Sequence, residues 1–68
     1  MRLKEGDYTV NDWGGRGLSV RHTPTGAGFS TQGDAADLFW AEWRVSVLSL
    51  EEFLEVFGYN DLLTLPGD

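Results

Sequence analysis

Few residues of this chain could carry out catalysis. His22 is the only histidine, and there is no cysteine, so a general base or a metal site would have to be completed by carboxylates or hydroxyls. Several serines can be paired with His22 on paper, but none stands in the strand-to-helix turn that exposes a nucleophile. No calcium-binding loop is present either. We therefore expect a non-enzymatic protein with no metal and no cofactor.

Carboxylates are abundant, and most of them follow residue 33. Residues 1–33 hold four basic and three acidic residues, a balance of +1, whereas residues 34–68 hold one basic and eight acidic residues, a balance of −7. Such a field repels phosphate and attracts a basic surface. The alternative is a solvated acidic face, because acidic charge also keeps a small protein soluble. The acids that we expect at a partner surface are Asp34, Asp37, Glu42, Glu51, Glu52, Glu55 and Asp61.

A different chemistry is suggested by residues 13–17, which read Trp-Gly-Gly-Arg-Gly. An aromatic ring beside a basic glycine turn could stack on an unpaired base. The same residues also suit a hairpin turn, so one copy does not separate the two interpretations. The alternative hypothesis is therefore a small nucleic-acid-binding module that uses the N-terminal hairpin. It requires Trp13, Arg16 and Arg21 to share an exposed face away from the acidic residues.

Length and composition limit the architecture to one domain, residues 1–68. A chain this short buries only about 60% of its unfolded surface, and its nine aromatic residues compensate by burying large side chains. The lack of cysteine favours a reducing cytoplasm. No apolar run approaches the roughly 20 residues of a membrane span, and the N-terminal residues lack the apolar centre of a signal peptide. We expect a soluble, cytoplasmic monomer.

The clearest secondary-structure signal is a helix over residues 49–58. Ser49 stands at the N-cap, and Glu52 three residues later completes a capping box. Apolar residues at positions 50, 53, 54 and 57 form one stripe of helical period. Gly58 can supply the left-handed residue that ends the helix. The opposite side, with Glu51 and Glu55, is acidic.

The N-terminal half predicts an antiparallel meander of three strands. Residues 7–13 and 18–23 alternate apolar and polar side chains on either side of a glycine turn, and residues 27–30 follow a Pro-Gly turn as a short third strand. Residues 1–6 form a polar lead-in that frays or adds to a sheet edge.

Residues 31–48 carry two competing periods. As a helix over 32–43, with Thr31 as the N-cap, they place Phe39, Trp40 and Trp43 on one apolar face. As a strand, residues 39–47 alternate. The Asp-Ala-Ala-Asp run favours the helix, because acids suit a first helical turn. A possible short fourth strand over 45–48 would then lie between the helices, and Leu62, Leu63 and Leu65 would fold back over the core. The predicted fold is α+β, with both helices packed on one face of the meander.

In size, charge and lack of cysteine, the whole chain resembles the small acidic inhibitors that phages encode against host defence, anti-CRISPR proteins among them. The resemblance implies a CRISPR effector subunit as the partner and the host cytoplasm as the location. The leading hypothesis is an acidic protein-binding inhibitor that occupies a basic, nucleic-acid-binding surface. Its carboxylates would stand in for phosphates, and a few aromatic residues, Trp40 and Trp43 among the candidates, would supply the desolvated contact.

Overall fold

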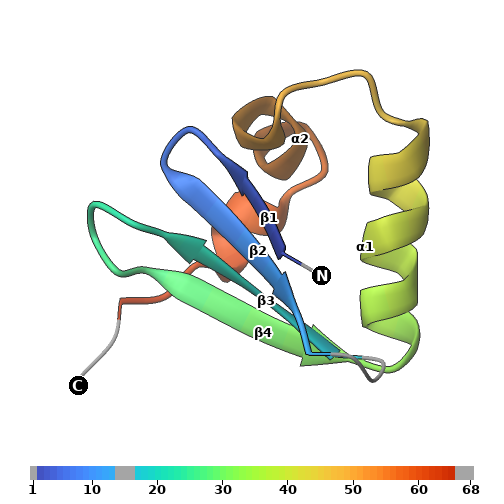
Figure 1. Ribbon diagram of the computed structural model, residues 1–68, viewed down its shortest axis with the longest axis horizontal. Helices are drawn as coiled ribbons and strands as arrows, with labels where there is room; N and C mark the ends of the chain where they lie inside the picture. The colour runs from blue at the N-terminus through green and yellow to red at the C-terminus, as the bar shows by residue number, and fades with distance from the viewer. Residues whose placement is uncertain (1, 14–16, 66–68) are drawn as a thin grey trace.

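The computed structural model describes residues 2–13 and 17–65 and has an α+β architecture. Four strands form one antiparallel sheet in the order β1-β2-β3-β4, with α1 and α2 at its side and end (Figure 1). The elements are β1 Arg2–Glu5, β2 Tyr8–Asp12, β3 Gly17–His22, β4 Gly28–Gln32, α1 Asp34–Val45, α2 Leu50–Val56 and the 3-10 helix η1 Tyr59–Leu62.

The predicted meander is confirmed as β2, β3 and β4, with end points that differ by one or two residues. A fourth strand is present, but its place differs from the expected one. It is β1, which pairs along β2 with Leu3 opposite Val10, whereas in the predicted stretch 45–48 Val45 ends α1 and residues 46–48 form no strand. The polar lead-in therefore adds to the sheet edge, because the exposed edge of β2 offers unpaired backbone groups.

The sheet has one apolar face, and both helices pack on it. Val10 and Val20 lie opposite each other in register and are fully buried. Alternation along each strand then sends every second side chain to the same side. The core on that side draws on the sheet and on both helices: Tyr8, Val10, Leu18, Val20, Ala36, Phe39, Leu50, Phe53 and Leu54. Both helices thus contribute side chains to the core on this face of the sheet.

Helix α1 confirms the helical interpretation of the ambiguous stretch, although its start was predicted wrongly. Thr31 is paired with Leu18 inside β4 and cannot cap the helix. The N-cap is Gly33, whose φ of 70° turns the chain from β4 directly into the first helical turn. Pairing with β3 extends β4 to Gln32, so the helix begins and ends two residues later than the predicted range of 32–43.

Helix α2 is capped twice, once by Ser49 and once from the sheet. The Glu52 backbone N–H donates to Ser49 Oγ at 3.3 Å, as the sequence predicts. The Glu52 carboxylate accepts at 3.0 Å from the Ser49 hydroxyl, whereas the predicted capping box has it accept from the Ser49 backbone N–H. In addition, the Leu50 backbone N–H donates to Glu5 Oε1 at 2.8 Å. Glu5 lies at the end of β1, so the edge strand supplies a negative charge to the helix N-terminus.

Replacing Glu5 with alanine is expected to lower the free energy of unfolding by about 1 kcal/mol, as losses of helix caps do. The measurement is urea unfolding followed by tryptophan fluorescence. Lys4→Ala is the matched control, because Lys4 is an exposed neighbour on the same strand, and its effect should stay within about 0.5 kcal/mol. Equal stability of Glu5→Ala and the wild type would show that this cap contributes nothing.

The C-terminal segment returns to the sheet but only partly as predicted. Gly58, with φ of 81°, is left-handed as expected and leads into η1. Leu63 packs against the core, whereas Leu62 and Leu65 are exposed, contrary to the prediction for these leucines. Thr64 instead pairs with Gly28 through two backbone hydrogen bonds of 3.0 and 2.9 Å. This bridge covers part of the edge of β4 and carries Leu65 away from the core.

Candidate functional site

Three acids of two distant segments converge at one end of the molecule, around Tyr8. Glu51 and Glu55 are one turn apart on α2 and therefore lie on the same side of it. Burial raises the pKa of the Tyr8 hydroxyl, and so do the charges of Glu51, Asp7 and Glu55. Asp7, Tyr8 and Glu51 also line one pocket at this end of the molecule. We call Asp7, Glu51, Glu52 and Glu55 the α2 acidic surface.

The surface is exposed and has no basic residue on its own helix. All four of its side chains are exposed to solvent, and the helix has no basic residue in its last turn. Glu52 is partly committed to the cap of Ser49, so Glu51, Glu55 and Asp7 are the groups most available to a partner. Asp7 was missed from the sequence, because it is far from α2 along the chain and is brought there only by the β1–β2 turn.

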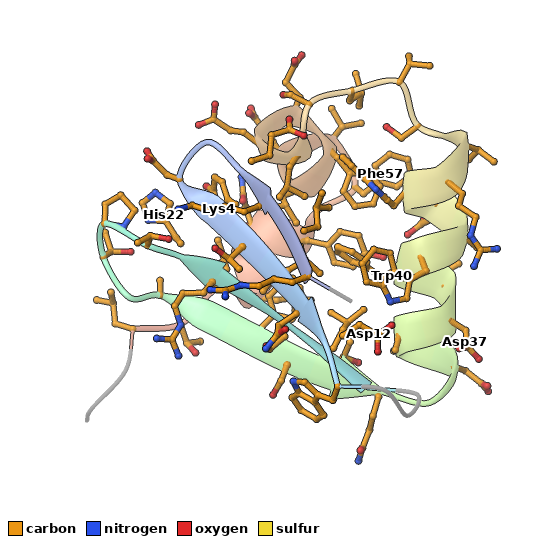
Figure 2. All side chains as sticks on the ribbon, viewed as in Figure 1. Lys4, Asp12, His22, Asp37, Trp40 and Phe57 are labelled. Atoms are coloured by element: carbon orange, nitrogen blue, oxygen red, sulfur yellow. The ribbon has the colours of Figure 1, made fainter. Side chains whose placement is uncertain are left out.

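The remaining predicted acids lie elsewhere. Asp34 and Asp37 are in the first turn of α1, and the end of that helix near β4 is distant from α2 (Figure 2). Asp61 is exposed on η1. Glu42 has a structural role instead, since its carboxylate accepts a hydrogen bond from the Tyr59 hydroxyl. The structure thus brings together the α2 acids of the predicted set but not the set as a whole.

Tyr59 links α1 and η1 to the core. Its ring contacts those of Phe29, Phe39 and Phe53, with centroid separations between 5.0 and 6.0 Å. Burial raises the pKa of its hydroxyl, and the hydrogen bond to Glu42 raises it further. The protonated phenol is therefore the form that the folded protein stabilises.

This pKa shift predicts a loss of stability in alkali. The pKa of Tyr59 is higher in the folded than in the unfolded state, so its contribution is fully present below about pH 10, the ordinary tyrosine value, and is lost as the pH rises through the folded-state pKa. We expect the free energy of unfolding of Tyr59→Phe to fall less steeply above pH 10 than that of the wild type. Absorbance at 295 nm measures the ionisation of the tyrosines as the pH rises, and circular dichroism at the same pH values shows whether the protein is still folded. Titration of the tyrosines near pH 10 in a still-folded protein would contradict it.

His22 is placed structurally in β3. Its Nδ1 lies 2.8 Å from Thr25 Oγ1, within the β3–β4 connection, and its ring contacts that of Tyr8 at 4.9 Å. Over residues 2–13 and 17–65, no group of three or more histidine and carboxylate side chains is placed to hold a metal ion. The neighbours of His22 thus fix its ring at the end of the sheet.

The aromatic residues of α1 face the core. Trp40 contacts Phe39 and Trp43 contacts Phe53, both edge to face, and the two tryptophans are only partly buried (Figure 2). Two apolar side chains beside the α2 acidic surface are exposed to solvent: Val56 is 68% exposed and Phe57 is 40% exposed. Val56 follows Glu52 by one helical turn, so an apolar contact adjoins the acids.

The other face of the sheet has the opposite charge. Its outward positions hold three of the four basic residues in the described chain, Arg2, Lys4 and Arg21. In the described strands no outward position holds an acid: these positions are Arg2, Lys4, Thr9, Asn11, Gly17, Ser19, Arg21, Gly28, Ser30 and Gln32. We call this the open sheet face. Trp13 borders it and is 55% exposed, while Arg16 lies outside the described residues.

Comparison with known proteins adds no relative. No family model matches the chain, and searches of curated proteins and of solved structures found no match. Neither described helix has the length and apolar character that crossing a membrane requires.

Proposed function

We propose that the protein is a non-enzymatic binding protein that uses the α2 acidic surface to occupy a basic surface of a protein partner. The observation that carries the proposal is the exposure of Glu51 and Glu55 one turn apart on α2, with Asp7 lining the same pocket as Glu51 and Tyr8. These three carboxylates are exposed and carry the same charge, so a basic partner would gain favourable interactions with all of them on binding.

The mechanism is electrostatic steering followed by a small apolar contact. An exposed acidic surface accelerates association with a basic partner and disfavours acidic ones. Val56 and Phe57 then supply apolar area that is removed from water at the edge of the contact. Backbone hydrogen bonds at both ends of the helix hold its backbone, and thus the Cα atoms of Glu51 and Glu55, at a fixed spacing.

The partner that fits such a surface is a basic cleft that ordinarily holds nucleic acid. Carboxylates at fixed spacing can then replace phosphates, and the protein acts as a competitive inhibitor. A CRISPR effector subunit is the specific candidate that the resemblance in size and charge suggests. Nothing in this mechanism requires a cofactor, and a monomer suffices.

The test is an affinity pull-down of the tagged protein from bacterial lysate, treated with nuclease, with bound proteins identified by mass spectrometry. We expect a basic nucleic-acid-binding protein that stays bound after nuclease treatment and is released by about 0.5 M salt, where the Debye length is only a few ångströms. The purified partner should then lose its nucleic acid when the protein is added. Capture of no basic protein, or a partner that binds nucleic acid equally well in its presence, would refute the proposal.

A further inference from the structure

We infer that the open sheet face binds single-stranded nucleic acid, with an unpaired base stacked on Trp13 and phosphates on Arg2, Lys4 and Arg21. This face lies opposite the helices, and the inference does not depend on the function proposed for the α2 acidic surface. Three independent features of the face support it: the position of the indole, a groove beside it, and the sign of the charge.

The Trp13 indole is held over the sheet by a glycine. A Cβ atom on Gly17 would lie 2.5 Å from Trp13 Cε3 and 3.0 Å from Cζ3, so the six-membered ring sits directly over the Gly17 backbone. The Trp13 backbone N–H also donates to the Gly17 carbonyl at 3.1 Å. With 55% of the residue still exposed, the ring is supported from below and remains open to solvent. This is the arrangement that base stacking needs.

A groove extends from Trp13 along the outer side of β3 and β4. The groove is open to solvent and has a volume of about 530 Å³. Ser19, Arg21, Gly28 and Ser30 line it from the outward side of the strands, and Thr64 and Leu65 of the returning segment line it beside β4. Gly28 has no side chain, and a Cβ there would lie 2.6 Å from the Val20 carbonyl oxygen. Hydroxyl groups that line the groove can pair with a base or a sugar.

The charge of the face selects an anion. Lys4 and Arg21 are both aligned with Thr9 in the ladder, so they lie two strands apart, about 10 Å, while Arg2 is two residues from Lys4 on the same side of β1. The nearest acids in the strands point the other way: Glu5 caps α2, and Asp12 is directed toward the helix side (Figure 2). Phosphate can therefore approach the face without meeting a carboxylate there, despite the net charge of −6.

These features favour a single strand over a duplex. Bases in a duplex are already stacked and cannot lie on the indole unless they are unpaired. Because only three described cations face outward, the salt dependence should be modest. The slope of log K against log salt concentration is expected to be about −2, from roughly 0.7 per phosphate contact in single strands.

The test measures fluorescence anisotropy of a fluorescein-labelled 12-mer of thymidylate at about 20 mM salt with the full chain. We expect saturable binding that is weakened at least about 10-fold by Trp13→Ala, the size of one lost stacking contact. Trp13→Phe should restore part of the affinity. Gly17→Ala should weaken binding similarly, because it displaces the indole while keeping it in the protein. The double variant Lys4→Glu with Arg21→Glu should abolish binding.

The single variant Arg21→Glu should also weaken binding. Arg44→Glu is its matched control, because it makes the same charge change of two units on α1 and should alter the affinity less than about 2-fold. Circular dichroism identifies any variant that fails to fold, and Trp13→Phe then serves in place of Trp13→Ala. Absence of binding at low salt would overturn the inference, as would equal loss in Arg44→Glu and Arg21→Glu. A third outcome is that the protein binds no oligonucleotide but has a mass in light scattering that rises with concentration. If the variant at Lys4 and Arg21 abolishes that rise, the face binds a second copy of the chain instead.

Discussion

Replacing both Glu51 and Glu55 with lysine is expected to weaken binding to the basic partner at least about 100-fold at low salt. We expect association to become slower and dissociation to become faster. The substitutions change the local charge by four units at the point where Asp7 adds a third acid. The protein should remain folded, because both side chains are exposed. Surface plasmon resonance against the partner identified by the pull-down measures the effect.

Asp34→Lys with Asp37→Lys is the matched control, because it makes the same change in net charge in the first turn of α1. We expect a loss of less than about 5-fold, since that turn is distant from α2 and salt screens charges beyond roughly 10 Å. Glu52 is left unchanged in both variants, because its side chain and backbone cap α2. Equal losses in the two variants would show that net charge, and not the α2 acidic surface, determines binding.

Phe53→Ala is expected to remove a large part of the free energy of unfolding at room temperature. Phe53 is fully buried, and its ring contacts those of Phe39, Trp43, Phe57 and Tyr59 at centroid separations between 4.7 and 5.7 Å. Truncating a buried phenylalanine costs about 3 to 5 kcal/mol. A domain of this size has a total stability of roughly 3 to 10 kcal/mol, so the loss approaches the whole margin.

Thermal unfolding followed by far-ultraviolet circular dichroism measures this effect. Phe53→Leu removes fewer buried atoms and should cost about 1 to 2 kcal/mol, which keeps the effect measurable if the alanine variant does not fold. Val56→Ala is the control on the same helix, because Val56 is 68% exposed and its truncation should change stability by less than about 0.5 kcal/mol. A melting temperature of Phe53→Ala close to that of the wild type would contradict the assignment of Phe53 to the centre of the core.

The two proposed surfaces lie on opposite sides of the sheet, and this has a consequence for how they act. A basic protein on the α2 acidic surface and a single strand on the open sheet face would not compete for the same residues. The charge-reversed variant at Glu51 and Glu55 should therefore keep its oligonucleotide binding, and the variant at Lys4 and Arg21 should keep its protein partner. Each proposal can thus fail without affecting the other.

The sequence by itself determined the elements whose signals are local. The cap at Ser49, the buried stripe of Leu50, Phe53 and Leu54, and the left-handed Gly58 all depend on residues within a few positions of one another. The alternation of β2 and β3 is equally local, and it already separated Val20 from Arg21. The sequence also shows that the acidic residues are concentrated after residue 33.

Only the tertiary structure decided which of these residues meet. β1 is polar and became a strand because β2 offered it an edge, and this placed Glu5 on the N-terminus of α2, 45 positions away. The β1–β2 turn placed Asp7 near Glu51 and Glu55, while the Glu42 carboxylate accepts a hydrogen bond from the Tyr59 hydroxyl. Such contacts depend on how the sheet and the helices pack, and neither periodicity nor local propensity carries that information. The separation of an acidic helix side from a basic sheet face therefore emerges only when the chain is folded.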